Sequence, residues 1–152
     1  MTTPLPDPPT AKELRAARLA HVLAAAVRAD ECEAADVLRV LRHELRRLNT
    51  RGAEKAPRRS VEAQRVLDTY GADRPRNGSP DALHADHVWG LAESQLRVLD
   101  TVAQWVDELH RLKEVVCVTA TENYRLMALE RAGVWGDEKY RQADIDLIEV
   151  PS

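Results

Sequence analysis

No phenylalanine occurs among the 152 residues of this chain, and aromatic residues make up only 4%. Large rings can therefore contribute little to the core, which must be built mainly from smaller aliphatic side chains. The abundance of alanine, leucine and valine favours helices that pack through such side chains. The length suits one domain with a substantial hydrophobic core.

Cysteine is also scarce, since Cys32 and Cys117 are the only two and stand far apart in the sequence. This count excludes a zinc site made of four cysteines, and such isolated thiols are typical of a protein in a reducing cytoplasm. No run of about 18 apolar residues occurs, so a membrane-spanning helix is not expected. The proline-rich residues 1–9 lack the apolar segment of a signal peptide. We therefore expect a cytoplasmic protein without membrane contacts.

Charge is unevenly distributed along the chain, although the net charge is only −3. Residues 39–76 hold 11 basic and 5 acidic side chains, whereas residues 77–152 hold 7 basic and 14 acidic ones. The basic segment predicts a surface that binds nucleic acid through its phosphates. Two other interpretations stay open, namely that these arginines bind an acidic partner protein or form a solvated surface.

Residues 10–57 are predicted to form a helical hairpin and a basic loop, after a proline-rich arm of residues 1–9. Thr10 has the capping-box spacing to Glu13 that begins a helix. The predicted buried face of this helix consists of apolar residues at helical spacing: Leu19, Val22, Leu23, Ala26 and Val27. Asp30 and Glu33 offer a second cap, and the next helix has its own apolar face: Val37, Leu38, Leu41, Leu45 and Leu48.

Residues 58–152 are predicted to contain the strands of the protein. Ser60 caps a third helix that ends at Gly71. Two strands are expected at 83–89 and 114–119, because β-branched residues dominate the second of them. Helices are expected at 94–112 and 121–132, a further turn after Asp137, and a last strand at 145–150. The predicted fold is a mostly helical α+β protein, with an N-terminal helical hairpin and a small β-containing C-terminal half.

Three residues carry the strongest indication of chemistry. Asp86 and His87 are adjacent in the first expected strand, and Asn123 opens the helix after the second. A neutral imidazole can generate a nucleophile from water, and one hard cation with oxygen ligands can stabilise the charge on a phosphate. Adjacent strand residues point to opposite faces, so Asp86 and His87 can face one ion only at a bulge or strand end.

This strand, strand and helix pattern resembles the ββα-metal finger of HNH-type (His-metal-finger) nucleases. The resemblance implies that His87 is the general base and that Asp86 and Asn123 hold a divalent metal, Mg²⁺ or Mn²⁺. Glu130 stands near the place of the family's third ligand and becomes an extra metal candidate. The interval between His87 and Asn123 is longer than in the family, and the zinc-binding cysteines of the family are absent, as in a degenerate finger.

The function expected from this resemblance is a metal-dependent endonuclease that hydrolyses phosphodiester bonds of nucleic acid, and Arg131 could hold the phosphate. Arg58 and Arg59 are further phosphate candidates, because they belong to the basic segment and directly precede the helix start at Ser60. The alternative is a non-catalytic helical interaction protein, such as an antitoxin-like or defence-associated accessory subunit. It would bind a protein partner, or a second copy of the chain, through the N-terminal helices. A hydrolase using His87 with Cys117 is disfavoured, because an apolar strand suppresses the thiolate. The two main hypotheses differ in whether Asp86, His87 and Asn123 converge.

Overall fold

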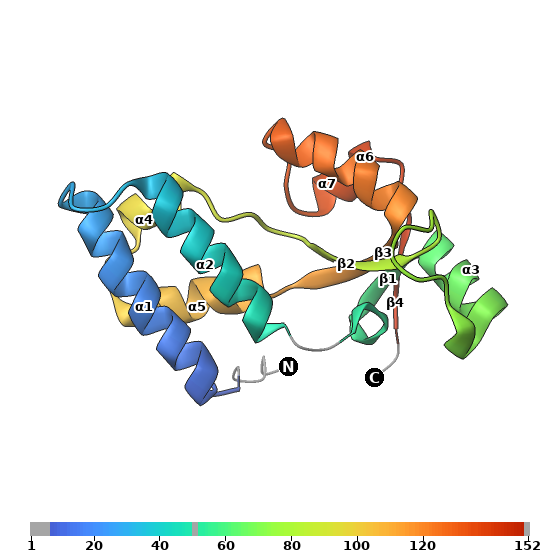
Figure 1. Cartoon of the computed structure of the whole chain (residues 1–152), viewed down its shortest axis with the longest axis horizontal. Coiled ribbons are helices and arrows are strands. Elements are labelled where there is room, and N and C mark those ends of the chain that lie inside the picture. The colour runs from blue at the N-terminus through green and yellow to red at the C-terminus, as the bar shows by residue number, and fades with distance from the viewer. Residues whose placement is uncertain (1–6, 50–51, 151–152) are drawn as a thin grey trace, which may run out of the picture. The chain divides into compact units, whose positions relative to one another are not determined.

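The computed structural model describes residues 7–49 and 52–150, which form two compact units (Figure 1). The first unit contains residues 7–49 and 91–113, and the second contains 52–90 and 114–150. The predicted mostly helical α+β fold is confirmed, because the described residues form seven α-helices and a four-stranded mixed sheet. Each unit is built from two chain segments, whereas the sequence predicted a division after residue 57.

The first unit consists of four helices: α1 (Ala11–Arg28), α2 (Ala34–Leu48), α4 (Glu93–Val98) and α5 (Val102–Leu112). Thr10 caps α1 as predicted, and its side chain accepts a hydrogen bond of 3.1 Å from the Glu13 amide. Of the predicted arm, residues 1–6 lie outside the described part, and residues 7–10 form neither helix nor strand. Helix α2 begins after Glu33, while Asp30 takes a positive φ of 57° in the preceding turn and caps nothing.

Helix α1 packs against α2, α4 and α5 through small side chains. Its buried residues are Ala16, Ala17, Ala20, Ala24 and Val27. Part of the predicted face was wrong, because Val22 is 62% exposed. A helix with several close neighbours buries alanines, since these allow the helix axes to approach each other.

The predicted helix at 94–112 is divided into α4 and α5 by a short extended segment around Leu99. Thr101 caps the second piece by accepting a hydrogen bond of 3.1 Å from the Gln104 amide. Arg28 donates hydrogen bonds of 2.9 Å to the carbonyls of Leu96 and Leu99, which the break leaves without helical partners. Hydrogen bonds from Arg28 at the end of α4 and the Thr101 cap at the start of α5 therefore both stabilise the break.

The second unit is built on strands β1 (Arg58–Ser60), β2 (Leu83–His87), β3 (Val115–Thr119) and β4 (Leu147–Glu149). They lie in the order β2-β3-β1-β4, with β1 parallel to β3 and the outer strands antiparallel to their neighbours. Strands β2, β3 and β4 fall within predicted strands, but β1 was missed. Its last residue, Ser60, is itself the cap of α3, and three residues are too few to show alternation.

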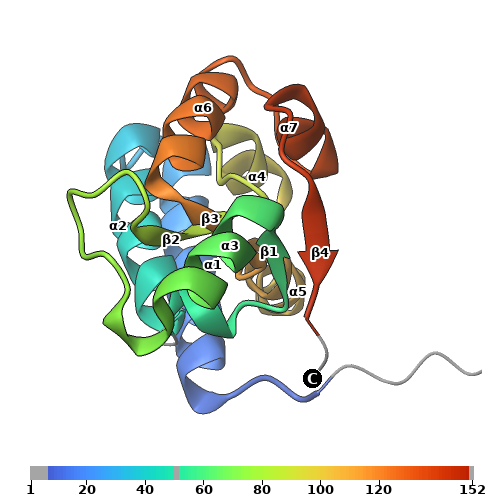
Figure 2. The ribbon, with the colours of Figure 1, turned by 90° about the vertical axis from the view of Figure 1, so that its right-hand side faces the viewer.

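Helices cover both faces of this sheet. On one face, Val116 and Val118 of β3 pack against α6 (Ala120–Arg131) and α7 (Asp137–Gln142). On the other face, Cys117 packs against α3 (Val61–Tyr70) and the 3₁₀ turn η1 (Ala53–Lys55), which precedes a second 3₁₀ turn η2 (Gly71–Asp73). Figures 1 and 2 show α6 with α7 and α3 around the strands. Burial on both faces explains the nearly continuous apolar sequence of β3.

A Val-Trp-Gly sequence occurs twice in this unit, at residues 88–90 and 134–136, and the two copies pack against each other. A Cβ atom at Gly90 would lie 2.4 Å from the ring of Trp135, and one at Gly136 would lie 2.7 Å from the ring of Trp89. The Gly136 amide donates a hydrogen bond of 2.9 Å to the Val88 carbonyl. This contact holds the start of α7 beside the end of β2.

We predict that Gly136→Ala lowers the free energy of unfolding by at least about 2 kcal/mol. The backbone at this position has a positive φ that disfavours any side chain, and the added Cβ would clash with the ring of Trp89. Gly133→Ala is the matched control, since Gly133 also has a positive φ but no atom within 4 Å of its added Cβ. It should cost only about 1 kcal/mol. Urea unfolding measures both, and equal losses would contradict the packing of Trp89 on Gly136.

Candidate functional site

Strands β2 and β3 are antiparallel, and α6 follows β3 at once and contacts both strands. This arrangement places the predicted residues on a shared framework. Asp86 pairs with Val116 across the strands, so both side chains face α6 and α7. His87 is the next residue and pairs with Val115, whose side chain packs on the opposite face with Cys117.

Asp86 is 5% exposed and is held by two residues of α7. The Tyr140 hydroxyl donates a hydrogen bond of 2.5 Å to Asp86 Oδ2, and the Lys139 Nζ lies 2.9 Å from the same oxygen. Burial, together with the neighbouring Asp86 carboxylate, raises the pKa of Tyr140 far above its usual value. The hydroxyl therefore stays protonated and remains a donor to Asp86.

Lys139 is the central residue of this cluster, although its side chain is completely buried. Its ammonium lies 2.9 Å from Glu130 Oε1 as well as 2.9 Å from Asp86, and it donates a hydrogen bond of 2.7 Å to the His87 carbonyl. The Trp135 ring lies 4.8 Å from Nζ and shields it. Three oxygens from β2 and α6 thus surround one cation supplied by α7.

Two carboxylates share this single ammonium group. The pKa of Glu130 is raised, chiefly by burial and further by the nearby Asp86, against the lowering effect of Lys139. We call Asp86, Glu130, Lys139 and Tyr140 together the buried polar cluster of the second unit. The sequence did not predict the roles of Lys139 and Tyr140, because the segment Asp137–Gln142 looks like a short solvated helix.

Asn123 lies near the opposite end of α6, seven positions before Glu130. Seven residues correspond to about 10 Å along a helix axis. Its amide nitrogen contacts Met127 Sδ at 3.8 Å, and its side chain lines a cavity together with His84. Asp86, His87 and Asn123 therefore do not converge, because the strand alternation separates the first two and the helix length separates the third.

No group of three or more His, Cys, Asp or Glu side chains suited to a metal ion occurs in residues 7–49 and 52–150. Of the predicted ligands, only Asp86 and Glu130 are brought together, and the ammonium of Lys139 lies between them. The residues present therefore do not fit the predicted divalent metal while Lys139 keeps this position.

The predicted phosphate-binding arginines have protein partners. Arg58 forms ion pairs of 3.0 Å with Glu114 and with Asp137, and although burial lowers its pKa, these acidic neighbours raise it overall. Arg59 donates a hydrogen bond of 3.0 Å to Gln64. Arg131, at the end of α6, is exposed and has no partner among the described residues. Only Arg131 is thus available to an anion without breaking an existing contact.

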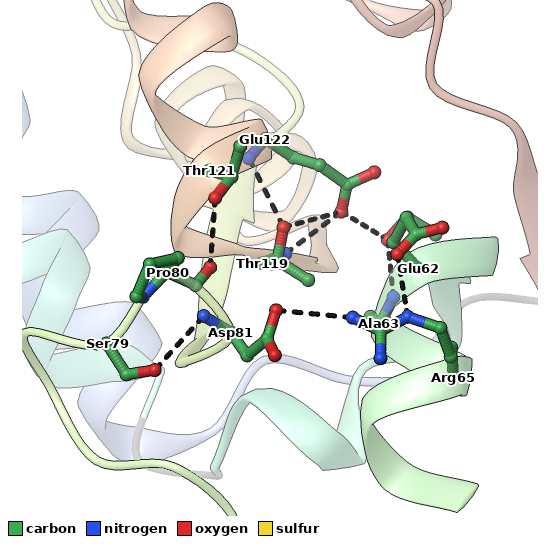
Figure 3. A network of polar contacts seen from close by, with 10 residues as sticks. Glu62, Ala63, Arg65, Ser79, Pro80, Asp81, Thr119, Thr121 and Glu122 are labelled. Carbon is green, nitrogen blue, oxygen red and sulfur yellow. Dashed lines mark hydrogen bonds and ion pairs between the residues drawn. The ribbon is translucent and has the colours of Figure 1, made fainter. Parts of the chain in front are cut away.

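A second buried carboxylate, Glu122, connects two helix starts, as Figure 3 shows beside the neighbouring Asp81 and Arg65. Glu122 Oε1 accepts hydrogen bonds from Ser60 Oγ at 2.5 Å and from the Thr119 amide at 3.0 Å. Ser60 Oγ in turn accepts a hydrogen bond of 3.0 Å from the Ala63 amide, as predicted for the cap of α3. The Glu122 carboxylate and the Ser60 hydroxyl are therefore both engaged in helix capping, which is a structural role.

The buried thiol of Cys117 is not an activated nucleophile. Burial raises its pKa to about 11, so the thiol stays neutral near pH 7.

Comparisons with protein-family profiles, curated proteins and solved structures found no match to this chain. No helix in the described segments is long and apolar enough to cross a membrane.

We predict that Lys139→Met destabilises the protein by about 3–5 kcal/mol, because it leaves two carboxylates without their buried counter-charge. Arg141→Met is the control, since this arginine forms an exposed pair with Glu138 and its loss should change stability far less than the loss of Lys139. Urea unfolding is the measurement. Adding Asp86→Asn to Lys139→Met should recover part of the loss, and a further loss instead would refute the ion-pair role of Lys139.

The pH dependence of stability should carry the signature of Glu130. Its pKa is raised in the folded chain, so its contribution to stability is present at low pH and is lost as pH rises through the raised pKa. Relative to Glu130→Gln, the wild type should therefore lose stability as pH rises above the ordinary pKa range of a glutamate. Relative to Glu138→Gln, the wild type should instead lose stability as pH falls below the ordinary glutamate range, because hydrogen bonds from Gln142 and Arg141 lower the pKa of Glu138. Urea unfolding at pH values above and below the ordinary glutamate pKa tests both signs.

Proposed function

We propose that this chain is a non-catalytic interaction protein whose helical hairpin binds an acidic protein segment. The observation that carries the proposal is the buried ammonium of Lys139 between Asp86 and Glu130. A metal-dependent nuclease needs that position for a divalent ion, with a base directed at the same point. Here the position holds a side-chain cation, and His87 belongs to the opposite face of the sheet.

The binding surface that we propose is a groove between α1 and α2 in the first unit. The groove encloses about 320 Å³. Ala16, Leu19 and Leu48 give it an apolar part, and its rim carries Lys12, Arg15 and Arg47 beside one acidic residue. That residue is Glu44, which forms an ion pair of 3.3 Å with Arg47, so the rim keeps a net positive charge. Side chains of this mixture complement a protein segment that carries both aliphatic and acidic residues.

The overall charge of the first unit favours a protein over nucleic acid as the partner. Its residues, 7–49 and 91–113, hold 11 basic and 11 acidic side chains, so their net charge is zero. A nucleic-acid-binding unit would be expected to carry a positive excess. The basic residues of the groove lie at the start of α1 and the end of α2, while Glu31, Glu33 and Asp36 lie in and after the turn between the helices.

The first experiment separates binding from catalysis. Supercoiled plasmid and structured RNA are incubated with the wild type in Mg²⁺ or Mn²⁺, beside His87→Ala. We expect no metal-dependent cleavage by either protein. Cleavage by the wild type that is lost in His87→Ala would instead establish the endonuclease and overturn the proposal.

The second experiment tests the groove with charge reversal. A photo-crosslinking residue at Leu48 in the wild type is used to capture and identify the partner in a nuclease-treated extract. Arg15→Glu/Arg47→Glu should weaken binding of that purified partner at least about tenfold, because repulsion replaces attraction at the rim. Arg39→Glu/Arg97→Glu, in the same unit and outside the groove, should bind like the wild type. Equal binding by both double variants would place the interface elsewhere.

A further inference from the structure

A second cavity lies in the other unit, at the beginning of α6, and encloses about 470 Å³. Its wall is formed by the turn at Ser79–Pro80, by His84 of β2 and by the first two turns of α6. The volume falls within the range of about 300–1,000 Å³ that is typical of small-molecule sites. The polar cluster around Lys139 is not part of its lining.

Two large, exposed side chains provide its apolar surface. Tyr124 is 76% exposed and Met127 is 41% exposed, and their spacing of three residues puts them on the same side of α6. An exposed aromatic ring can stack against a flat ligand, and a methionine thioether makes favourable contacts with aromatic rings. The pair therefore forms a platform for a planar group.

Two side chains that can both donate and accept hydrogen bonds lie beside this platform. Asn123 offers both an amide donor and a carbonyl acceptor, and its one hydrogen bond among the described residues is the weak contact with Met127 Sδ. His84 makes no side-chain hydrogen bond within the described ranges, 7–49 and 52–150, and it also carries a donor and an acceptor as a neutral ring. Groups of this kind pair with the donor and acceptor edge of a heterocyclic base.

The cavity offers little that would hold an anion. No Asp, Glu, Lys or Arg side chain is part of the lining. The first amides of α6 are already occupied, because Ala120 donates to the Ala82 carbonyl at 2.8 Å and Thr121 donates to the Pro80 carbonyl at 3.2 Å. The cavity therefore lacks the guanidinium, ammonium and free helix amide groups that usually bind a phosphate. The ligand is therefore uncharged at the part that enters the cavity.

The turn that closes one side is fixed in place, as Figure 3 shows. Thr121 Oγ1 donates a second hydrogen bond of 3.2 Å to the Pro80 carbonyl, and Ser79 Oγ accepts one of 3.3 Å from the Asp81 amide. Arg65 of α3 holds Asp81 through an ion pair of 3.2 Å. A preformed wall reduces the conformational entropy that binding would otherwise cost.

We infer that this cavity binds an uncharged, planar nitrogen heterocycle of the nucleobase class, stacked on Tyr124 and hydrogen-bonded by Asn123 and His84. The inference does not depend on the proposed partner of the helical groove, since its residues all belong to the second unit. The base could belong to a free nucleoside or to an unpaired nucleotide, and the chemistry recognised in the cavity is the same for both.

The test is a titration of the ¹⁵N-labelled full chain with adenosine, guanosine, cytidine and uridine, followed by amide chemical shifts. At least one nucleoside should shift amides around His84 and Asn123. Tyr124→Ala should weaken this binding by about 5-fold to 100-fold, in line with the loss of one base stack. Tyr70→Ala is the matched control, because Tyr70 is also exposed but lies on α3 outside the cavity, and it should bind like the wild type.

Two further arms decide the chemistry and the source of the base. Asn123→Ala should weaken nucleoside binding. N-acetylphenylalanine amide has an aromatic ring without the donor and acceptor edge of a heterocycle, so it should bind the wild type more weakly than the best nucleoside does. An oligonucleotide that binds more tightly than its abasic form would identify the unpaired nucleotide as the source. No shifts at millimolar nucleoside, equal binding by Tyr124→Ala and Tyr70→Ala, or stronger binding of the phenylalanine amide would each overturn the inference.

Discussion

The buried ammonium of Lys139 is the interaction on which the second unit depends. It connects the end of β2, through Asp86 and the His87 carbonyl, with the end of α6 at Glu130, and it does so from α7. Removing an ammonium and two carboxylates from water is costly, so the arrangement is stable only because each group has several close partners. The interlocked Trp89 and Trp135 motifs fix the chain beside the cluster and keep α7 in register with the sheet.

Because Lys139 binds Glu130 at only one end of α6, the two ends of this helix differ in chemical character. At its C-terminal end, Glu130 belongs to a charged cluster that is closed by Trp135 and satisfied internally. At its N-terminal end, Asn123 and Tyr124 border an open cavity without charged side chains. A catalytic arrangement would have required residues from both ends to meet. The helix instead separates the Lys139 cluster from the cavity that we infer to bind a planar ligand.

Several parts of this architecture follow from short-range rules and could be predicted. The hydroxyls of Thr10 and Ser60 precede helices, and the β-branched sequence of β3 is incompatible with an exposed helix. Other parts depend on tertiary contacts that leave no local pattern. Val22 is exposed because alanines on the other side of α1 allow closer helix packing, and Lys139 is buried because two distant carboxylates require it. The Asp86-His87 pair had the composition of a metal site, but strand alternation directs the two side chains to opposite faces.

The most direct test of the account is a Mn²⁺ titration of the ¹⁵N-labelled wild type, observed through paramagnetic broadening of its amide signals. If Lys139 holds the cation position permanently, broadening should be no stronger at Asp86, Glu130 and Lys139 than at exposed acidic residues such as Glu62 and Asp68. Selective broadening at Asp86 and Glu130 that is reversed by a chelator would show that a divalent ion displaces the ammonium, and it would contradict the account.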